Sequence, residues 1–271
     1  MTNLEHTSGK AGWNVRRARH GIAVREVEIP MPPSGPDQLA DVMISAIGPR
    51  TRVLFFSGIL SPTGTVMPVR KICDAARAKG VITVVDGAHM NGQIPMRIHE
   101  LGCDYYAGSP HKWMFAPAGS GILWGRTEML DKLWPTIVTG AWDRKESHAA
   151  RFMQMGTNNR AIFEGMVAGV KFANSIGPER IYTRIHALAK QIRDTAAKLD
   201  YLRVLTPPDD RLYGSLVTFE MPGINRDKFG RLCRERKMWM AGGDRLRVSA
   251  HIHTRPKDVD MLFATLAESR A

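Results

Sequence analysis

The chain has 271 residues, of which 44% are hydrophobic and 24% charged, proportions that are ordinary for a globular protein. This length allows one large domain, or a large and a small one. The three cysteines are scattered and none forms a CxxC pair, which excludes a disulfide framework. The first residues, MTNLEHTSGK, carry no apolar leader, and no apolar run is long enough to span a bilayer. We therefore expect a cytoplasmic protein without a membrane partner or a metal site.

A formal net charge of +12 raises the question of a nucleic-acid partner. The basic residues are spread over short stretches such as RKICDAARAK and CRERK, which also contain apolar or acidic residues. The sequence has no zinc finger, no RNA-recognition sequence and no Lys/Arg block with stacking aromatic residues. We therefore expect no nucleic-acid partner, and an anionic ligand fits the charge equally well.

The first half of the chain alternates short β-branched or aromatic runs with helical patterns. Apolar strands that alternate with helices are typical of a parallel sheet covered on both faces. Strands are expected over residues 22–30, 51–60, 81–88 and 103–109, and helices within 32–48 and over 67–80 and 96–102. This half is predicted to be an α/β domain.

The second half has a different pattern. Helices are expected over about 161–175, 179–199 and 226–237 and at the C-terminus, with strands over 216–221 and 245–250. This order indicates a small α+β domain. We place the boundary at Gly177-Pro178, which gives domains 1–177 and 178–271.

Polar side chains follow three successive strands of the predicted parallel sheet, where ligands collect in doubly wound folds. They are Ser57 and the turn 61–64 after the first strand, Asp86 and His89 after the second, and Ser109, His111 and Lys112 after the third. One helix and one strand separate Asp86 from Lys112, and such a crossover brings both to one edge of the sheet. Alone, Asp86 could form a turn, His111 could be a core histidine, and Lys112 could reach solvent from a loop. Their joint occurrence favours a binding site.

Schiff-base catalysis is the chemistry that needs such a set. A partly desolvated lysine amine loses its proton more readily and forms an imine with an aldehyde. Pyridoxal 5'-phosphate (PLP) then acts as an electron sink, provided that a buried carboxylate keeps its pyridine nitrogen protonated. Lys112 suits the imine and Asp86 the pyridine nitrogen, while Ser109 and His111 would hold the phosphate.

The segment 84–126 carries an Asp with a His three residues later, then Ser-x-His-Lys, then Pro-x-Gly-x-Gly. This combination resembles the class V aminotransferase family, PLP enzymes of fold type I. The SPTG turn (61–64) and the GTNN segment (156–159) look most like its isopenicillin N epimerase-like branch. The resemblance implies a role for each matched position. Asp86 corresponds to the partner of the pyridine nitrogen, His89 to the residue near the ring hydroxyl, Ser109 and His111 to phosphate ligands, and Lys112 to the lysine that forms the imine.

Four further positions match the family outside this segment. Ser61, in SPTGTVMPV, stands where many members have Asn at the cofactor site. Thr157, in MGTNNRA, resembles the threonine that reaches the phosphate of the neighbouring subunit in a homodimer. Arg247, in RLRVSAHIHT, resembles the arginine that grips the substrate α-carboxylate, and His6, in LEHTS, resembles the residue that stacks on the cofactor.

Family members are typically longer at the N-terminus, where they carry an arm, the first strand and helices of the large domain, and a Gly/Thr turn for the phosphate. On this comparison we expect a large domain that is truncated at its N-terminus and has an incomplete phosphate site. A non-catalytic homologue with a structural or binding role is therefore the alternative to an enzyme.

The reaction is left open among three types. Cysteine desulfurases of this family place a nucleophilic cysteine just before the arginine strand, and the matching segment KMWMAGGDRLRVS has none, which disfavours a desulfurase. Aminotransferase, epimerase and C–S lyase activities stay open, because the fold does not choose among them. Trp142 could line the substrate pocket or simply pack.

Overall fold

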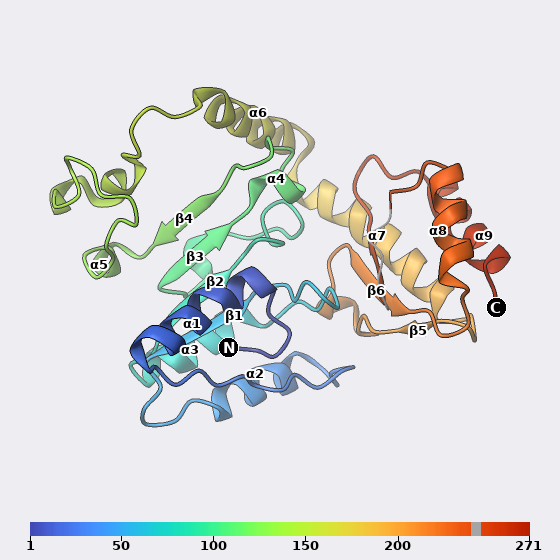
Figure 1. The fold of residues 1–271 in the computed structure, drawn as a ribbon, viewed down its shortest axis with the longest axis horizontal. Coiled ribbons are helices and arrows are strands. Elements are labelled where there is room, and N and C mark those ends of the chain that lie inside the picture. The colour runs from blue at the N-terminus through green and yellow to red at the C-terminus, as the bar shows by residue number, and fades with distance from the viewer. Residues whose placement is uncertain (240–244) are drawn as a thin grey trace.

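The computed structural model describes residues 1–239 and 245–271, and it shows two lobes that are each built around their own sheet (Figure 1). The N-terminal sheet has the order β1-β2-β3-β4, with β1 Val53–Ser57, β2 Ile82–Asp86, β3 Tyr105–Gly108 and β4 Ile122–Gly125. The pairs β1–β2 and β2–β3 are parallel, and β4 pairs with β3 in the antiparallel direction. The predicted α/β fold with a mainly parallel sheet is confirmed.

Helices lie on both faces of this sheet, because successive strand residues point to opposite sides. Phe55 of β1 faces α1 (Thr7–His20), where its ring lies 5.8 Å from that of Trp13. Leu54 and Phe56 face the other way and are buried in the core with residues of α2 (Pro36–Ser45) and α3 (Val69–Ala78). The remaining elements of this lobe are η1 Ile98–Leu101, α4 Pro110–Trp113, α5 Thr127–Leu130, η2 Lys145–Met153 and α6 Arg160–Ile176.

The C-terminal lobe is an antiparallel sheet covered by helices. Its strand order is β5-β6-β7, with β5 Arg203–Val204, β6 Leu216–Glu220 and β7 Arg245–Ser249. The helical elements are α7 Pro178–Ala196, η3 Asp210–Leu212, α8 Arg226–Glu235 and α9 Pro256–Glu268. A separate core cluster joins α7, α8 and α9 to this sheet. The helix break between α6 and α7 falls at Gly177, and the domain boundary placed there stays a prediction.

Buried polar bonds join the two lobes. The Gln93 side chain is fully buried, and its Oε1 accepts from the backbone N–H of Ser215 at 2.8 Å. The Thr206 hydroxyl donates to the Thr63 carbonyl at 2.8 Å. The ring of His251, which follows β7, donates from Nε2 to the carbonyl of Trp113 at 3.3 Å. These bonds join residues after β5, before β6 and after β7 to the segments that follow β1, β2 and β3.

One expectation about the elements needs correction, and two elements were not expected. The strand expected over 22–30 is wrong: Val27 forms only an isolated bridge to Thr2, and the alternating pattern arises because Val27 and Ile29 are buried along an extended segment. Helix α1 was not expected, because it has no buried residue and hence no apolar stripe; it ends at Gly21, which adopts φ 64°. Strand β4 was not expected either, being short and set between glycines.

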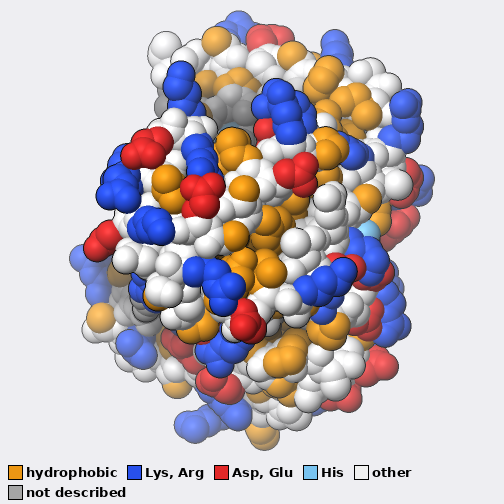
Figure 2. Space-filling view, turned by 90° about the vertical axis from the view of Figure 1, so that its right-hand side faces the viewer, with side chains coloured by type: hydrophobic (Ala, Val, Ile, Leu, Met, Phe, Trp, Pro, Cys, Tyr) orange, Lys and Arg blue, Asp and Glu red, His pale blue; other side chains and the backbone are white. Residues whose placement is uncertain are grey.

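The surface of the C-terminal lobe mixes charges of both signs. On the face that Figure 2 shows, the Lys and Arg side chains drawn are interspersed with Asp and Glu and with apolar strips. A backbone-binding surface for nucleic acid gathers its Lys and Arg on one face. None of the helices within 1–239 and 245–271 combines the length and the apolar character needed to cross a membrane.

Candidate active site

A cavity of about 500 Å³, here named the strand-end cavity, opens where β1, β2 and β3 end. Its lining includes most of the site residues predicted from the sequence, namely His6, Ser61, Asp86, His89, Ser109, His111 and Lys112. The parallel register explains this, because Ser57, Asp86 and Ala107 are paired across the three strands and the following residues leave the sheet at one edge. The structure therefore brings Asp86 and Lys112 into one cavity.

Lys112 lies on the short helix α4 with its side chain open to the cavity. Its Nζ is 3.3 Å from Nε2 of His89. Burial lowers the pKa of the Lys112 amine, the Asp86 carboxylate opposes this shift, and Arg247 adds to it. The side chain is exposed in part, and the protein around the amine disfavours its charged form relative to a lysine in water. A neutral amine is the reactive form of lysine.

His89 is held as a neutral ring. Burial lowers the pKa of His89 to about 3, and the charges of Lys112, Arg247 and His6 act in the same direction. Its Nδ1 accepts a hydrogen bond from the indole N–H of Trp113 at 3.2 Å. The carboxylate of Asp86 accepts from the backbone N–H of Ala88 at 2.8 Å, which fixes the carboxyl group at the end of β2.

Ser109 and His111 border the same cavity on the α4 side. Ser109 precedes α4, and its hydroxyl makes no capping bond to the helix. His111 donates from Nδ1 to the Ser120 carbonyl at 2.6 Å, which orients the ring and leaves Nε2 for a ligand. A hydroxyl and an imidazole nitrogen at one end of the cavity are groups that can bind an anion.

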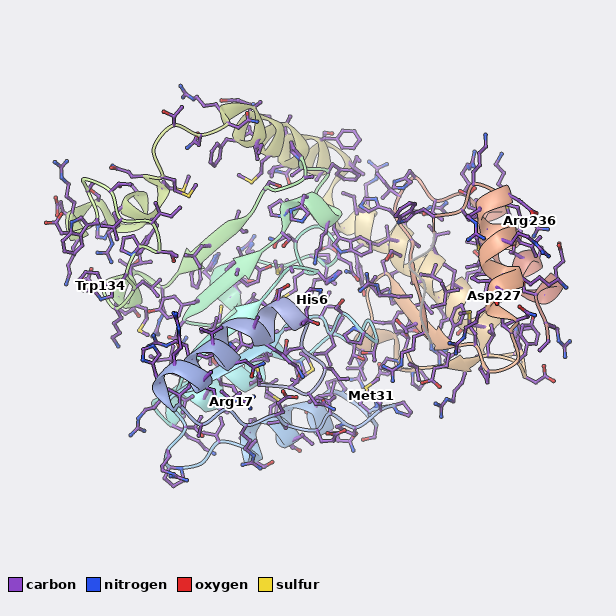
Figure 3. All side chains as sticks on the ribbon, in the orientation of Figure 1. His6, Arg17, Met31, Trp134, Asp227 and Arg236 are labelled. Atoms are coloured by element: carbon purple, nitrogen blue, oxygen red, sulfur yellow. The ribbon has the colours of Figure 1, made fainter. Side chains whose placement is uncertain are left out.

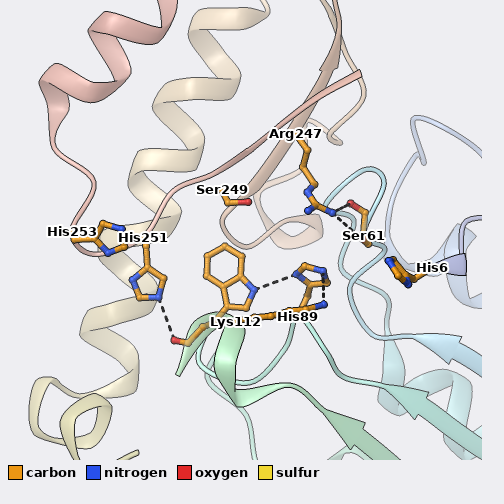
Figure 4. A pocket seen from close by; sticks show the side chains of 9 residues that line it. His6, Ser61, His89, Lys112, Arg247, Ser249, His251 and His253 are labelled. Carbon is orange, nitrogen blue, oxygen red and sulfur yellow. Dashed lines mark hydrogen bonds between the residues drawn. The ribbon is translucent and has the colours of Figure 1, made fainter. Parts of the chain in front are cut away.

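A second cavity of about 520 Å³, here named the inter-lobe cavity, lies between β7 and the end of β3 (Figure 4). It shares His6, Ser61, His89 and Lys112 with the strand-end cavity, and its C-terminal side is lined by Arg247, Ser249, His251 and His253. Arg247 donates from Nη1 to the Ser61 hydroxyl at 2.5 Å and to the Ser61 carbonyl at 3.2 Å. Burial lowers the pKa of Arg247, and its planar fork faces the space in front of Lys112. Such a fork suits a carboxylate.

His6 borders both cavities and is held there by its neighbour Glu5. The buried Glu5 carboxylate accepts from the Ser57 N–H at 3.0 Å, from the Ser57 hydroxyl at 2.5 Å and from the Thr2 hydroxyl at 2.6 Å. Nδ1 of His6 accepts from the N–H of Ser8 and caps α1. Figure 3 shows His6 at the end of α1 that is nearest to the C-terminal lobe.

Two residues singled out in the sequence lie outside both cavities. Thr157 is exposed in the segment between η2 and α6, so its expected contact with a neighbouring subunit stays a prediction. Trp142 does not line the site; its ring stacks on Trp134 at 5.4 Å, on the far side of the N-terminal lobe from His6 (Figure 3).

Sequence reasoning missed Glu5, Trp113, Ser249, His251 and His253. For Ser249 the sequence carries a signal, since it continues the alternation that starts at Arg247 within β7. Alternate residues of a strand share a face, so Ser249 could have been predicted, whereas His251 and His253 lie beyond β7 at a turn over 252–253. The roles of Glu5 and Trp113 depend on contacts with residues distant in sequence, which no local pattern shows.

None of the three cysteines is placed to act as a nucleophile. Cys73, Cys103 and Cys233 are free and buried. Burial raises the pKa of Cys73 to about 12 and that of Cys103 to about 11, and it also raises the pKa of Cys233. A reactive thiolate needs a low pKa and access to its substrate, and these cysteines have neither.

The donor set of the strand-end cavity fits PLP. The cavity offers a carboxylate for a protonated pyridine nitrogen, an amine for the aldehyde, and a hydroxyl and an imidazole for the phosphate, from Asp86, Lys112, Ser109 and His111 respectively. Its volume of about 500 Å³ lies within the range of ordinary ligand pockets.

Comparisons with known proteins agree with this assignment. The family model for aminotransferase class-V matches residues 1–262. The chain is 32% identical over 287 residues to an isopenicillin N epimerase of Streptomyces clavuligerus, covering 98% of this chain and 72% of that protein. It is 28% identical over 232 residues to a probable cysteine desulfurase of Xylella fastidiosa (strain Temecula1), covering 83% of this chain and 54% of the relative.

Solved structures show the same fold. The cystine C–S lyase C-DES, in complex with its reaction product cysteine persulfide, has a TM-score of 0.87 at 25% identity and covers 100% of this chain and 74% of its own. The apo cysteine desulfurase of Thermococcus onnurineus NA1 has a TM-score of 0.85 at 20% identity, covering 98% of this chain and 71% of its own. The chain therefore belongs to the class-V aminotransferase family of PLP-dependent enzymes that act on amino acids.

Proposed function

We propose that this protein removes the Cα proton of an amino acid at a PLP site centred on Lys112 and that a proton then adds to the opposite face of Cα, so that its net reaction is epimerisation. The observation that carries the proposal is the position of Lys112, whose amine borders both cavities between Asp86 and Arg247. The likeness over 98% of the chain to an isopenicillin N epimerase favours epimerisation among the reactions of the family.

The cofactor would be held by residues of the strand-end cavity. Asp86 would accept a hydrogen bond from the pyridine nitrogen, Ser109 and His111 would bind the phosphate, and Lys112 would hold the aldehyde carbon. His6 would cover the ring from the side of α1. When bound, PLP withdraws electrons from the Cα of an attached amino acid and so makes its proton acidic.

The substrate would lie in the inter-lobe cavity. Arg247 would bind the α-carboxylate, and Ser61 keeps the guanidinium oriented through the hydrogen bonds at 2.5 and 3.2 Å. This anchor directs Cα toward Nζ of Lys112, which would take the Cα proton as a general base. For this task the amine must be neutral, and burial lowers the pKa of Lys112 in that direction.

A C–S lyase is the second candidate, supported by the likeness to C-DES at 25% identity. A cysteine desulfurase that relays sulfur through its own thiol is disfavoured. All three cysteines are buried, and the segment 237–249 contains none.

The family resemblance also supports a homodimer in which Thr157 reaches the partner's phosphate site. Exposed apolar side chains on the segment 131–159 are consistent with such an interface, among them Trp134, Ile137, Val138 and Met155. A cytoplasmic location and the domain limits 1–177 and 178–271 are part of the same proposal.

The test begins with the purified protein and added PLP. Borohydride reduction followed by peptide mapping should yield a covalent PLP adduct at Lys112. Amino acids incubated with the loaded protein in D₂O should then lose the Cα proton signal in NMR spectra, and chiral chromatography should detect the opposite enantiomer. Deuterium exchange with loss of the side-chain sulfur would indicate a C–S lyase, and an α-keto acid with an intact side chain would indicate an aminotransferase. Absence of an adduct would leave the non-catalytic alternative.

A further inference from the structure

Trp113 donates the hydrogen bond that decides which nitrogen of His89 carries a proton. The indole Nε1 lies 3.2 Å from Nδ1 of His89 and can only donate. Nδ1 must therefore offer its lone pair. A neutral imidazole has one N–H, so the proton of His89 is on Nε2.

Nε2 of His89 faces the amine of Lys112 at 3.3 Å (Figure 4). An ammonium group has three donors and no acceptor, so it cannot accept a hydrogen bond from Nε2–H. A neutral amine has a lone pair and can. The opposite arrangement, in which Lys112 donates to Nε2, would require a proton on Nδ1, directly against the indole N–H of Trp113.

The Trp113 ring is itself fixed from the C-terminal lobe. It is 4% exposed and stacks on the ring of His251, with centroids 5.6 Å apart and planes at 14°. His251 also donates from Nε2 to the Trp113 carbonyl at 3.3 Å, and its Nδ1 accepts from the N–H of Ile252 at 2.9 Å. Both nitrogens of His251 are thus engaged, and the orientation of Trp113 is determined by β7 and the residues that follow it.

We propose that Trp113 is a positioning residue that fixes His89 as the Nε2–H tautomer, so that His89 presents to Lys112 a donor that only the neutral amine can accept. The charged or titratable groups around this pair are Asp86 at the end of β2, Arg247 on β7 and His6 before α1. The Asp86 carboxylate favours the ammonium, whereas burial and Arg247 disfavour it. The hydrogen bonds from Trp113 through His89 to Lys112 also disfavour the ammonium form.

The inference deepens the proposed role of Lys112, but its test needs no cofactor. ¹⁵N NMR of the cofactor-free, ¹⁵N-histidine-labelled protein reports the tautomer, with the His89 signals assigned by their loss in His89→Gln. The parent protein should show an unprotonated Nδ1 and a protonated Nε2. Trp113→Phe keeps an aromatic ring against His251 but removes the N–H, and it should give a mixture of tautomers.

Lys112 reactivity is the second readout. Competitive acetylation at pH 8, quantified by mass spectrometry of the Lys112 peptide, should fall roughly threefold to tenfold in Trp113→Phe, the change expected for one net hydrogen bond. The exposed Lys79 serves as internal reference. Trp124→Phe, the same change on the neighbouring strand β4, should leave the tautomer and the Lys112 reactivity unchanged.

A second pair of variants tests the chain if Trp113→Phe does not fold. Glutamine in His89→Gln can accept from Trp113 through its carbonyl and donate to Lys112 through its amide, so Lys112 should keep its reactivity. Leucine in His89→Leu can neither accept from Trp113 nor donate to Lys112, so in that variant Lys112 should lose its reactivity. A proton on Nδ1 in the parent protein, or equal Lys112 reactivity in the two His89 variants, would overturn the proposal. If these results hold but Lys112 forms no PLP adduct, the proposed function fails and the inference stands.

Discussion

The two lobes contribute to the site in different ways. The N-terminal lobe supplies residues from the ends of different parallel strands, with Asp86 after β2 and Lys112 after β3. The C-terminal lobe supplies residues of a single segment, from Arg247 on β7 to His253 in the turn beyond it. In the proposed function the two lobes would have different roles: the strand ends of the N-terminal lobe would hold the cofactor, and β7 with the residues after it would bind the substrate and orient Trp113.

Replacement of Lys112 tests the first half of this comparison and has the largest expected effect. Lys112→Ala should reduce Cα proton exchange by roughly 10²–10⁴-fold, because the general base is lost. It should also abolish the borohydride-trapped adduct, because alanine has no amine to form the imine. Lys79→Ala, an exposed lysine at the end of α3, is the matched control and should retain full exchange. Exchange within a factor of ten of the parent protein in Lys112→Ala would show that the strand ends do not carry the chemistry.

Replacement of Arg247 tests the second half of the comparison, the contribution of the C-terminal lobe to substrate binding. Arg247→Ala should raise KM for an amino acid roughly 10- to 100-fold, since hydrogen bonds to a charged group contribute about 1.5–3 kcal/mol. Arg245→Ala is the control, because Arg245 lies on the same strand outside both cavities, 3.5 Å from Glu220. An unchanged KM in Arg247→Ala would assign carboxylate binding to another residue.

The neutral state of His89, between the two lobes, should make stability depend on pH. The pKa of His89 is lowered from 6.5 to about 3 in the folded protein. Below pH 6.5 the unfolded chain binds a proton that folded His89 does not, so this contribution to stability is present above 6.5 and is lost as the pH falls toward 3. Between pH 7 and pH 5 the loss should be about 2 kcal/mol.

Urea unfolding at pH 7, 6 and 5 measures this effect. The decrease in the free energy of unfolding should be smaller in His89→Gln, because glutamine binds no proton in either state. Equal pH dependence in the two proteins would mean that His89 titrates normally in the fold.

The smallest effect concerns the Glu5 contact that holds His6 at the cavities. Glu5→Gln weakens the buried bonds to Ser57 and Thr2 and should lower the free energy of unfolding by about 1 kcal/mol. Hydrogen exchange of the first six amides should increase as well. Glu26→Gln, which breaks only the exposed pair with Lys10 at 2.7 Å, should change little. An equal change in the free energy of unfolding and in amide exchange for Glu5→Gln and Glu26→Gln would contradict a specific stabilising role of the Glu5 carboxylate.

The sequence predicts the residues after β1, β2 and β3 better than those contributed by β7 and the turn that follows it, for a physical reason. Asp86 and Lys112 could be found because apolar parallel strands are recognisable and their carboxyl ends must meet. The alternation of helix and strand patterns along the sequence likewise predicts the α/β and α+β folds of the two lobes. Trp113 and Glu5 could not be found, because each acts through a partner distant in sequence.

The wrong strand over 22–30 illustrates the same limit. Alternation reports burial on one side, as for Val27 and Ile29, but it does not report whether another strand lies alongside. Helix α1 shows the converse case, since no apolar stripe marks a helix that buries no residue.

The buried bonds between the lobes have a consequence for the choice of substrate. Rotation of one lobe against the other would separate Gln93 from Ser215, Thr206 from Thr63 and His251 from the Trp113 carbonyl, at about 1–3 kcal/mol for each group left unpaired. A hinge motion of the lobes that adapts the inter-lobe cavity to different substrates is therefore disfavoured. Arg247 and Lys112, one on each lobe, would therefore keep a fixed distance from each other, and in the proposed reaction the substrate would have to fit that distance.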